Sequence, residues 1–149
     1  MMTATPKNWY SWNFDISDEG RTVATIDTSS WRERADLHVA GASYRVYREH
    51  ALGDFLLEQH GSVVARAEKP SAWFRSFVIR HDDRHYTLQA ASAFSRRFVL
   101  VDGTKDVGTI APAHPGTRRA EVDLPGSLPI ALRVFMVWLA LLLWRRDAS

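Results

Sequence analysis

Alternating hydrophobic and polar residues run through most of the chain and predict a protein built from short β-strands. Phe14 and Ile16 fall on one face of the first alternating segment, and Val23 and Ile26 fall on one face of the next. Turn-forming residues interrupt the pattern about every 8–12 residues, as in all-β domains. The pattern predicts eleven strands between residues 9 and 124, joined as antiparallel hairpins, and a flexible N-terminus over residues 1–8.

The predicted hairpins also repeat along the chain. The interval from Tyr44 to Tyr86 equals the interval between the turn glycines Gly61 and Gly103, and the interval from Gly20 to Gly61 is nearly the same. The repeating unit is about four strands, and the chain contains between two and three copies of it. A fixed period of about 40 residues indicates one supersecondary unit used several times.

The last segment, residues 127–146, is predicted to be a helix with Ser127 as its N-cap. No polar side chain occurs from Val134 to Trp144, so the helix must be surrounded by lipid or by protein. The eleven residues between Arg133 and Arg145 extend about 16 Å at 1.5 Å per residue, roughly half of a bilayer's hydrocarbon core. The strand lengths match the helix better, which favours a closed barrel around it. The alternative is a C-terminal membrane anchor behind a cytoplasmic β domain.

Length and composition favour a single domain over residues 1–149. Nineteen basic and seventeen acidic residues give a net charge of +2, which provides no argument for a nucleic-acid partner. Cysteine is absent, so disulfide and thiolate chemistry are excluded. The first residues lack the apolar run of a signal peptide, so we expect a cytoplasmic protein.

Three stretches carry a resemblance to a known superfamily. They are the run from Phe55 through Gly61 to Lys69, the run from Phe98 through Gly103 to Ile110, and the apolar segment 128–146. Together with the four-strand units, they resemble the tubby C-terminal-like superfamily, which includes LURP-one-related proteins and phospholipid scramblases. The resemblance implies a barrel of twelve strands around a central helix, and phosphoinositide or phospholipid-headgroup binding in some members. The expected partner is an anionic membrane lipid, which the protein would bind at the periphery of the membrane, or another protein.

Basic residues near predicted bends are the candidate ligand-binding groups, because guanidinium forks suit phosphate. They are Lys69, Arg75, Arg96 and Arg97. No nucleophile elbow, phosphate loop or zinc-ligand spacing occurs, so the sequence does not argue for an enzyme, a cofactor or a metal. A weaker alternative is a metal-dependent enzyme that uses His81, Asp83 and His85, although the Asp-Asp pair between them is ordinary turn chemistry.

Overall fold

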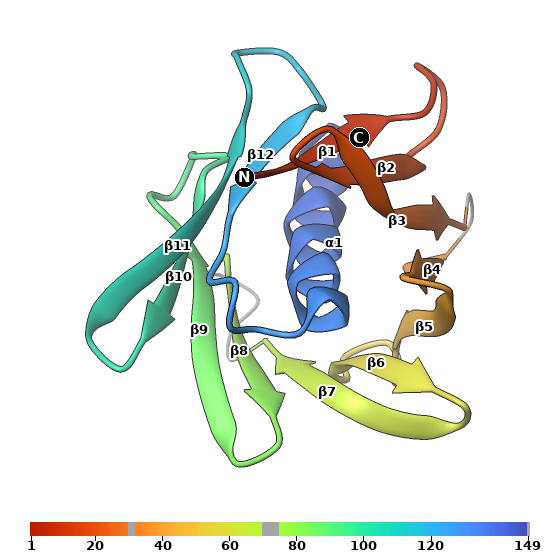
Figure 1. Ribbon diagram of the computed structural model, residues 1–149. Coiled ribbons are helices and arrows are strands. Elements are labelled where there is room, and N and C mark those ends of the chain that lie inside the picture. The colour runs from red at the N-terminus through yellow and green to blue at the C-terminus, as the bar shows by residue number, and fades with distance from the viewer. Residues whose placement is uncertain (30–31, 70–74, 149) are drawn as a thin grey trace.

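The computed structural model describes residues 1–29, 32–69 and 75–148, and over these residues it is a closed barrel of twelve antiparallel strands around one helix (Figure 1). The strands are β1 (Met2–Pro6), β2 (Phe14–Asp18), β3 (Arg21–Thr28), β4 (Arg34–Val39), β5 (Ala42–Arg48), β6 (Phe55–Gln59), β7 (Ser62–Glu68), β8 (Ser76–His81), β9 (Arg84–Ala90), β10 (Phe98–Asp102), β11 (Lys105–Pro112) and β12 (Ala120–Asp123). The helix is α1 (Ile130–Asp147). The predicted fold class is confirmed.

The prediction of a flexible N-terminus over residues 1–8 was wrong, because Met2–Pro6 forms β1. This strand pairs with β2 on one side and with β12 on the other, and it closes the barrel. Met2 and Ala4 point into the core. The predicted strand from residue 9 begins only at Phe14, since Asn8 accepts a hydrogen bond from the Ser11 amide (2.8 Å) and holds residues 7–13 as a loop.

The structure confirms the repeat and shows three copies of it. The hairpins β2–β3, β6–β7 and β10–β11 each contain a shift of register at the same place, after Ile16, Leu57 and Leu100. The turns of the first two hairpins are also equivalent, with positive φ at Glu19–Gly20 and at His60–Gly61, whereas the third turn has positive φ only at its first residue, Gly103. The third copy takes its fourth strand from the other end of the chain: Met2 lies opposite Val122, as Tyr44 lies opposite Leu37 and Tyr86 lies opposite Ile79.

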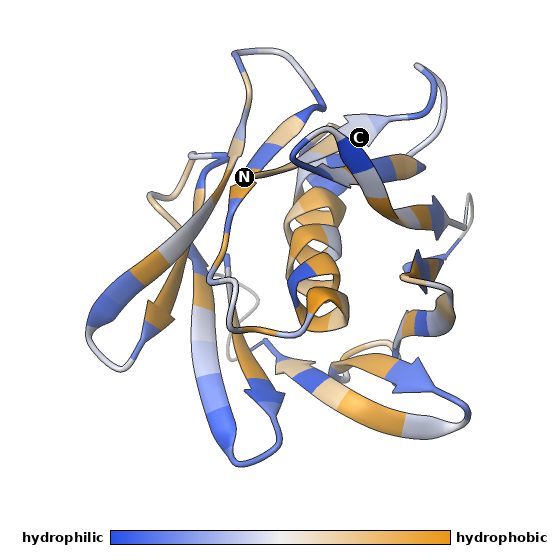
Figure 2. Cartoon of the chain, viewed as in Figure 1, coloured by the Kyte–Doolittle hydropathy of each residue, from blue (hydrophilic) through white to orange (hydrophobic). Residues whose placement is uncertain are grey.

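The helix α1 lies in the middle of the barrel, and its apolar surface is covered by the inner faces of the strands (Figure 2). Every residue from Val134 to Trp144 is buried. Ser127 is not the N-cap as predicted: Pro129 occupies that position, with extended backbone. A proline disfavours helical conformation in the residue before it, so Leu128 stays outside the helix and Ser127 is too far from the first turn to cap it. Among the described residues, no helix is long and apolar enough to cross a membrane.

Arg133, a charged residue in the first half of α1, lies at the opening of the barrel around the start of the helix. It is partly buried, and its Nε donates to the Leu128 carbonyl at 3.1 Å. Its Nη1 lies 3.4 Å from the Met2 sulfur. This guanidinium therefore remains at the edge of the core, where it does not have to be fully desolvated.

Candidate functional site

The six connections at one end of the barrel form a surface that we call the helix-end mouth, because α1 ends there. In an antiparallel barrel of consecutive strands, the connections alternate between the two ends. The described residues of the helix-end mouth are 7–13, 29, 32–33, 49–54, 69, 75, 91–97 and 113–119, with the end of α1 between them. The opposite end, which we call the hairpin end, comprises residues 19–20, 40–41, 60–61, 82–83, 103–104 and 124–129.

Charge is divided unequally between the two ends. Counted over the described residues, the helix-end mouth with residues 145–148 carries ten basic and four acidic side chains, a net charge of +6. The hairpin-end connections, all of them described, carry three acidic side chains and no lysine or arginine. The whole chain has a net charge of only +2, so its near-neutrality conceals a strongly basic end. Such a field attracts anions and orients the molecule toward anionic surfaces.

Several of these arginines hold the mouth loops in place. Arg96 donates to the Thr117 carbonyl at 2.5 Å, and its guanidinium lies 4.4 Å from the ring centre of Trp144. Trp144 donates in turn to the Arg96 carbonyl at 2.8 Å. Arg118 donates to carbonyls of the 7–13 loop. The loops 7–13, 91–97 and 113–119 are thus fixed to one another and to the helix.

The end of α1 is joined to the mouth by ion pairs. Arg146 forms a bidentate pair with Glu33 at 2.5 Å for both hydrogen bonds. Arg75 binds Asp147 at 2.7 Å and also donates to the Ser95 carbonyl at 2.7 Å. Bidentate pairs fix direction as well as distance, so the helix end has a defined position inside the ring of loops.

All four predicted ligand-binding residues belong to this mouth, and Lys69, Arg75 and Arg96 are partly buried there. Burial lowers the pKa of Lys69, and the neighbouring cations Arg146, Arg48 and Arg75 lower it further. Burial also lowers the pKa of Arg96. Desolvated cations that repel one another favour a nearby anion. The fourth predicted residue, Arg97, is exposed.

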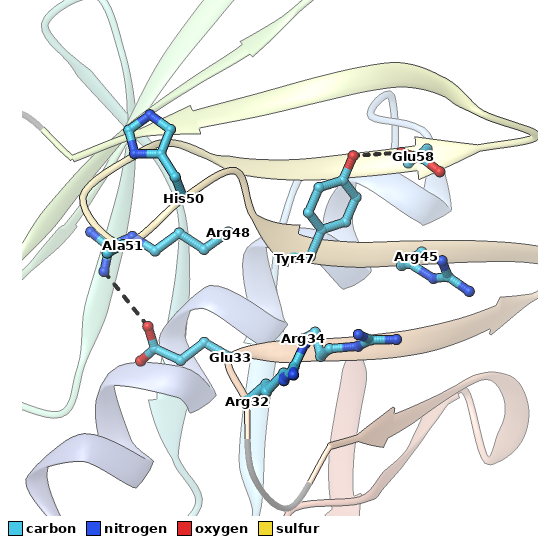
Figure 3. Close-up of a pocket in the computed structure, with 9 residues that line it drawn as sticks. All are labelled: Arg32, Glu33, Arg34, Arg45, Tyr47, Arg48, His50, Ala51 and Glu58. Atoms are coloured by element: carbon cyan, nitrogen blue, oxygen red, sulfur yellow. Dashed lines mark hydrogen bonds and ion pairs between the residues drawn. The ribbon is translucent and has the colours of Figure 1, made fainter.

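A basic pocket of about 620 Å³ lies beside the mouth, on the outer wall of β4, β5 and β6 (Figure 3). Alternation along the strands places Ala35, Val46 and Leu57 in the core and their neighbours outside. Four arginines, one histidine and two glutamates line the pocket. Its residues are Arg32, Glu33, Arg34, Arg45, Tyr47, Arg48, His50, Ala51 and Glu58.

Both carboxylates of the basic pocket are already engaged. Glu33 is bound by Arg146, and it lies 3.6 Å from Arg48. Glu58 accepts a hydrogen bond from the Tyr47 hydroxyl at 2.5 Å, and this bond raises the pKa of Tyr47. Figure 3 shows the contacts of Glu33 with Arg48 and of Glu58 with Tyr47 on either side of the pocket.

The remaining arginines of the basic pocket are exposed. Arg34 lies opposite Tyr47 in the β4–β5 pairing, and Arg45 lies opposite Glu58 in the β5–β6 pairing. In Figure 3 the guanidinium groups of Arg34 and Arg45 extend in the same direction from their neighbouring strands. Within the described part of the chain, Arg32 and Arg34 form no salt bridge, and Arg45 forms one with Asp36 at 3.7 Å. The pocket therefore presents the guanidinium groups of Arg32 and Arg34 without an ion-pair partner among the described residues.

Sequence reasoning missed this pocket. Arg45 and Tyr47 were recognisable as neighbours on one face of a strand. Their proximity to Arg34 depends on the cross-strand register, and the engagement of Glu33 depends on Arg146, 113 residues away in the chain.

The hairpin around His81, Asp83 and His85 is a turn between β8 and β9. Asp82 has a positive φ of 54°, a conformation that aspartate tolerates in tight turns. Among the described residues, no three histidine, aspartate or glutamate side chains are grouped so that they could hold a metal ion.

Comparison of the chain with protein-family models, with curated proteins and with solved structures gives no match.

Proposed function

We propose that this domain is a non-catalytic binding module that takes an anionic phospholipid headgroup in the basic pocket. The observation that carries the proposal is the pocket itself: about 620 Å³, lined by four arginines, with both of its glutamates bound to other groups. A pocket of this volume is in the range that encloses a small ligand. The resemblance to tubby-like proteins points to the same class of ligand.

The arginines of the pocket are suited to binding phosphate. Arginine presents paired N–H donors in a plane that matches two phosphate oxygens. Arg34 and Arg45 are diagonal neighbours on adjacent strands and extend in the same direction, which is the arrangement that the proposed phosphate site uses. Tyr47 lies on the same strand as Arg45 and opposite Arg34, so that its ring can pack against the glycerol or inositol part of a headgroup.

The cations of the helix-end mouth support binding from outside the pocket. Arg48 lines the pocket and is also one of the three cations that lower the pKa of Lys69. The basic field therefore continues from the pocket across the mouth. A lipid that carries more than one phosphate, or a neighbouring anionic lipid, gains from this extension because the attraction falls off only over about one Debye length, near 10 Å.

The test is calorimetric titration with inositol trisphosphate and with inorganic phosphate. Wild-type protein should bind inositol trisphosphate more tightly than phosphate, and the affinity should fall as salt is added. The double variant Arg34→Ser, Arg45→Ser should lose binding by about 100-fold or more, since it removes at least two charge-assisted hydrogen bonds that contribute about 1.5–3 kcal/mol each. Arg21→Ser is the matched control, because Arg21 is an exposed strand arginine next to the hairpin end. Equal binding by the double variant and by wild type contradicts the proposal.

A further inference from the structure

Large apolar side chains are exposed at three equivalent loop tips of the helix-end mouth. Tyr10 is 74% exposed, Leu52 is 89% exposed and Phe94 is 97% exposed. They are spaced by one repeat each, since the intervals from Tyr10 to Leu52 and from Leu52 to Phe94 are equal and match the period of the strands. Trp9, also exposed, packs edge-on against Tyr10 at 5.7 Å. Each structural unit thus contributes one apolar tip to the same end of the barrel.

The three loops are built to hold these tips outward. In each, a backbone hydrogen bond of 2.8 Å joins the two ends of the loop, and an arginine binds a carbonyl within it. The backbone bonds are Lys7–Asn13, Glu49–Asp54 and Ala91–Arg97. The arginines are Arg118, Arg48 and Arg75. Closed and braced loops present their tips in a fixed position, so little conformational entropy remains to be lost when the tips bind.

The tips are spread evenly around the barrel. They belong to the β1–β2, β5–β6 and β9–β10 connections, so each is four strands from the next in a closed ring of twelve. Three points define a plane. The plane lies at the end of the molecule with a net charge of +6 over its described residues, whereas the six connections of the hairpin end carry three acidic side chains and no lysine or arginine.

We propose that this face docks on an anionic lipid bilayer, with Tyr10, Leu52 and Phe94 inserted among the headgroups. The choice of anionic lipid rests on the proposed function, whereas the insertion rests on the tips alone. Aromatic and aliphatic side chains flanked by arginine and lysine have the composition of an interfacial membrane anchor. A protein interface has a contiguous apolar centre instead, and three separated tips do not provide one.

Docking in this orientation also brings the basic pocket to the bilayer. His50 and Ala51 line the pocket, and Leu52 follows them directly at the second tip. Insertion of Leu52 therefore places the pocket at headgroup depth. Each basic residue close to an anionic surface adds to the attraction.

Vesicle flotation tests the docking. Wild-type protein should float with phosphatidylcholine vesicles that contain phosphatidylserine, and the emission of Trp9 should shift to the blue when the first tip enters the bilayer. Replacement of one tip by serine should lower the partition coefficient about tenfold, the equivalent of burying one large apolar side chain. The triple variant Tyr10→Ser, Leu52→Ser, Phe94→Ser should no longer float. Because the three side chains are exposed, the urea stability of the variant should equal that of wild type.

Val63→Ser is the matched control, since Val63 is an exposed apolar residue (47%) next to the hairpin end. It should float like wild type. Flotation of the triple variant at wild-type level overturns the docking. So does a wild type that does not float but dimerises through the tips, a result that would assign the face to a second copy of the chain.

The two proposals fail separately. Binding of inositol trisphosphate with tip-independent flotation removes the docking and keeps the pocket. Tip-dependent flotation without binding of inositol trisphosphate removes the pocket and keeps the docking. Absence of both activities in the wild type removes both.

Discussion

Replacement of Gly108 by alanine should destabilise the protein, in contrast to the usual effect of this change in a strand. Gly108 pairs with Leu100, and the equivalent positions in the other two units are Ala24 opposite Ile16 and Ala65 opposite Leu57. The third unit differs because β12 leads directly into the connection to α1. A Cβ on Gly108 would lie 2.6 Å from the backbone oxygen of Asp123.

The expected loss follows from two opposing terms. The backbone of Gly108 is not in the left-handed region, so alanine would gain about 0.4–1 kcal/mol by restricting the unfolded chain. The added methyl group would also lie 3.0 Å from a side-chain carbon of Leu124, and neither this residue nor a strand carbonyl can move without disturbing the core. Overpacking of this kind costs about 1–3 kcal/mol. The net loss should be about 1–2 kcal/mol.

Urea unfolding followed by tryptophan fluorescence measures the effect. With a slope of about 2 kcal/mol per molar urea, the midpoint should fall by roughly 0.5–1 M at unchanged slope. Gly126→Ala is the control, because nothing lies within 4 Å of the Cβ that it would add, and its midpoint should stay the same or rise slightly. A Gly108→Ala midpoint at or above the wild-type value refutes the steric argument.

Two further predictions concern the mouth and the pocket. Trp144→Phe keeps most of the buried ring but removes the donor to the Arg96 carbonyl. It should therefore lower the free energy of unfolding by about 1 kcal/mol. A variant as stable as wild type would show that this hydrogen bond contributes nothing. Tyr47→Phe should cost about 1 kcal/mol at pH 7, measured by the same urea titration. The folded-state pKa of Tyr47 lies above its ordinary value of 10.0, so its contribution is complete below pH 10 and is lost as the pH rises through the folded-state pKa. The difference between wild type and variant should therefore shrink above pH 10, and a constant difference would contradict the role of the Glu58 hydrogen bond.

Much of the fold was predictable because the alternation, the turn glycines and the period are local signals. The first strand was missed since Met2–Pro6 has only five residues and includes alanine and proline, which are depleted in strands. The period of the repeat, however, did indicate this strand. Met2 precedes Tyr44 by the same interval that separates Tyr44 from Tyr86, and both Met2 and Tyr44 face the third strand of their unit.

The candidate site was predictable only in part. The cations near Lys69 were recognisable as residues beside a bend, but the basic pocket depends on the register between β4 and β5. The apolar tips show a different limit. Their spacing is visible in the sequence, yet a periodic aromatic residue is ordinarily core, and only the loops that hold Tyr10 and Phe94 outward reveal their exposure.

The position of α1 has a consequence for the order of events during synthesis. The helix follows all twelve strands in the chain, so the ribosome synthesises every strand of the barrel before it synthesises α1, which fills the barrel. The hairpins are local and can pair early. Closure of β1 against β12 and enclosure of the helix must wait, and until then the inner faces of the strands are exposed to water and to other nascent chains.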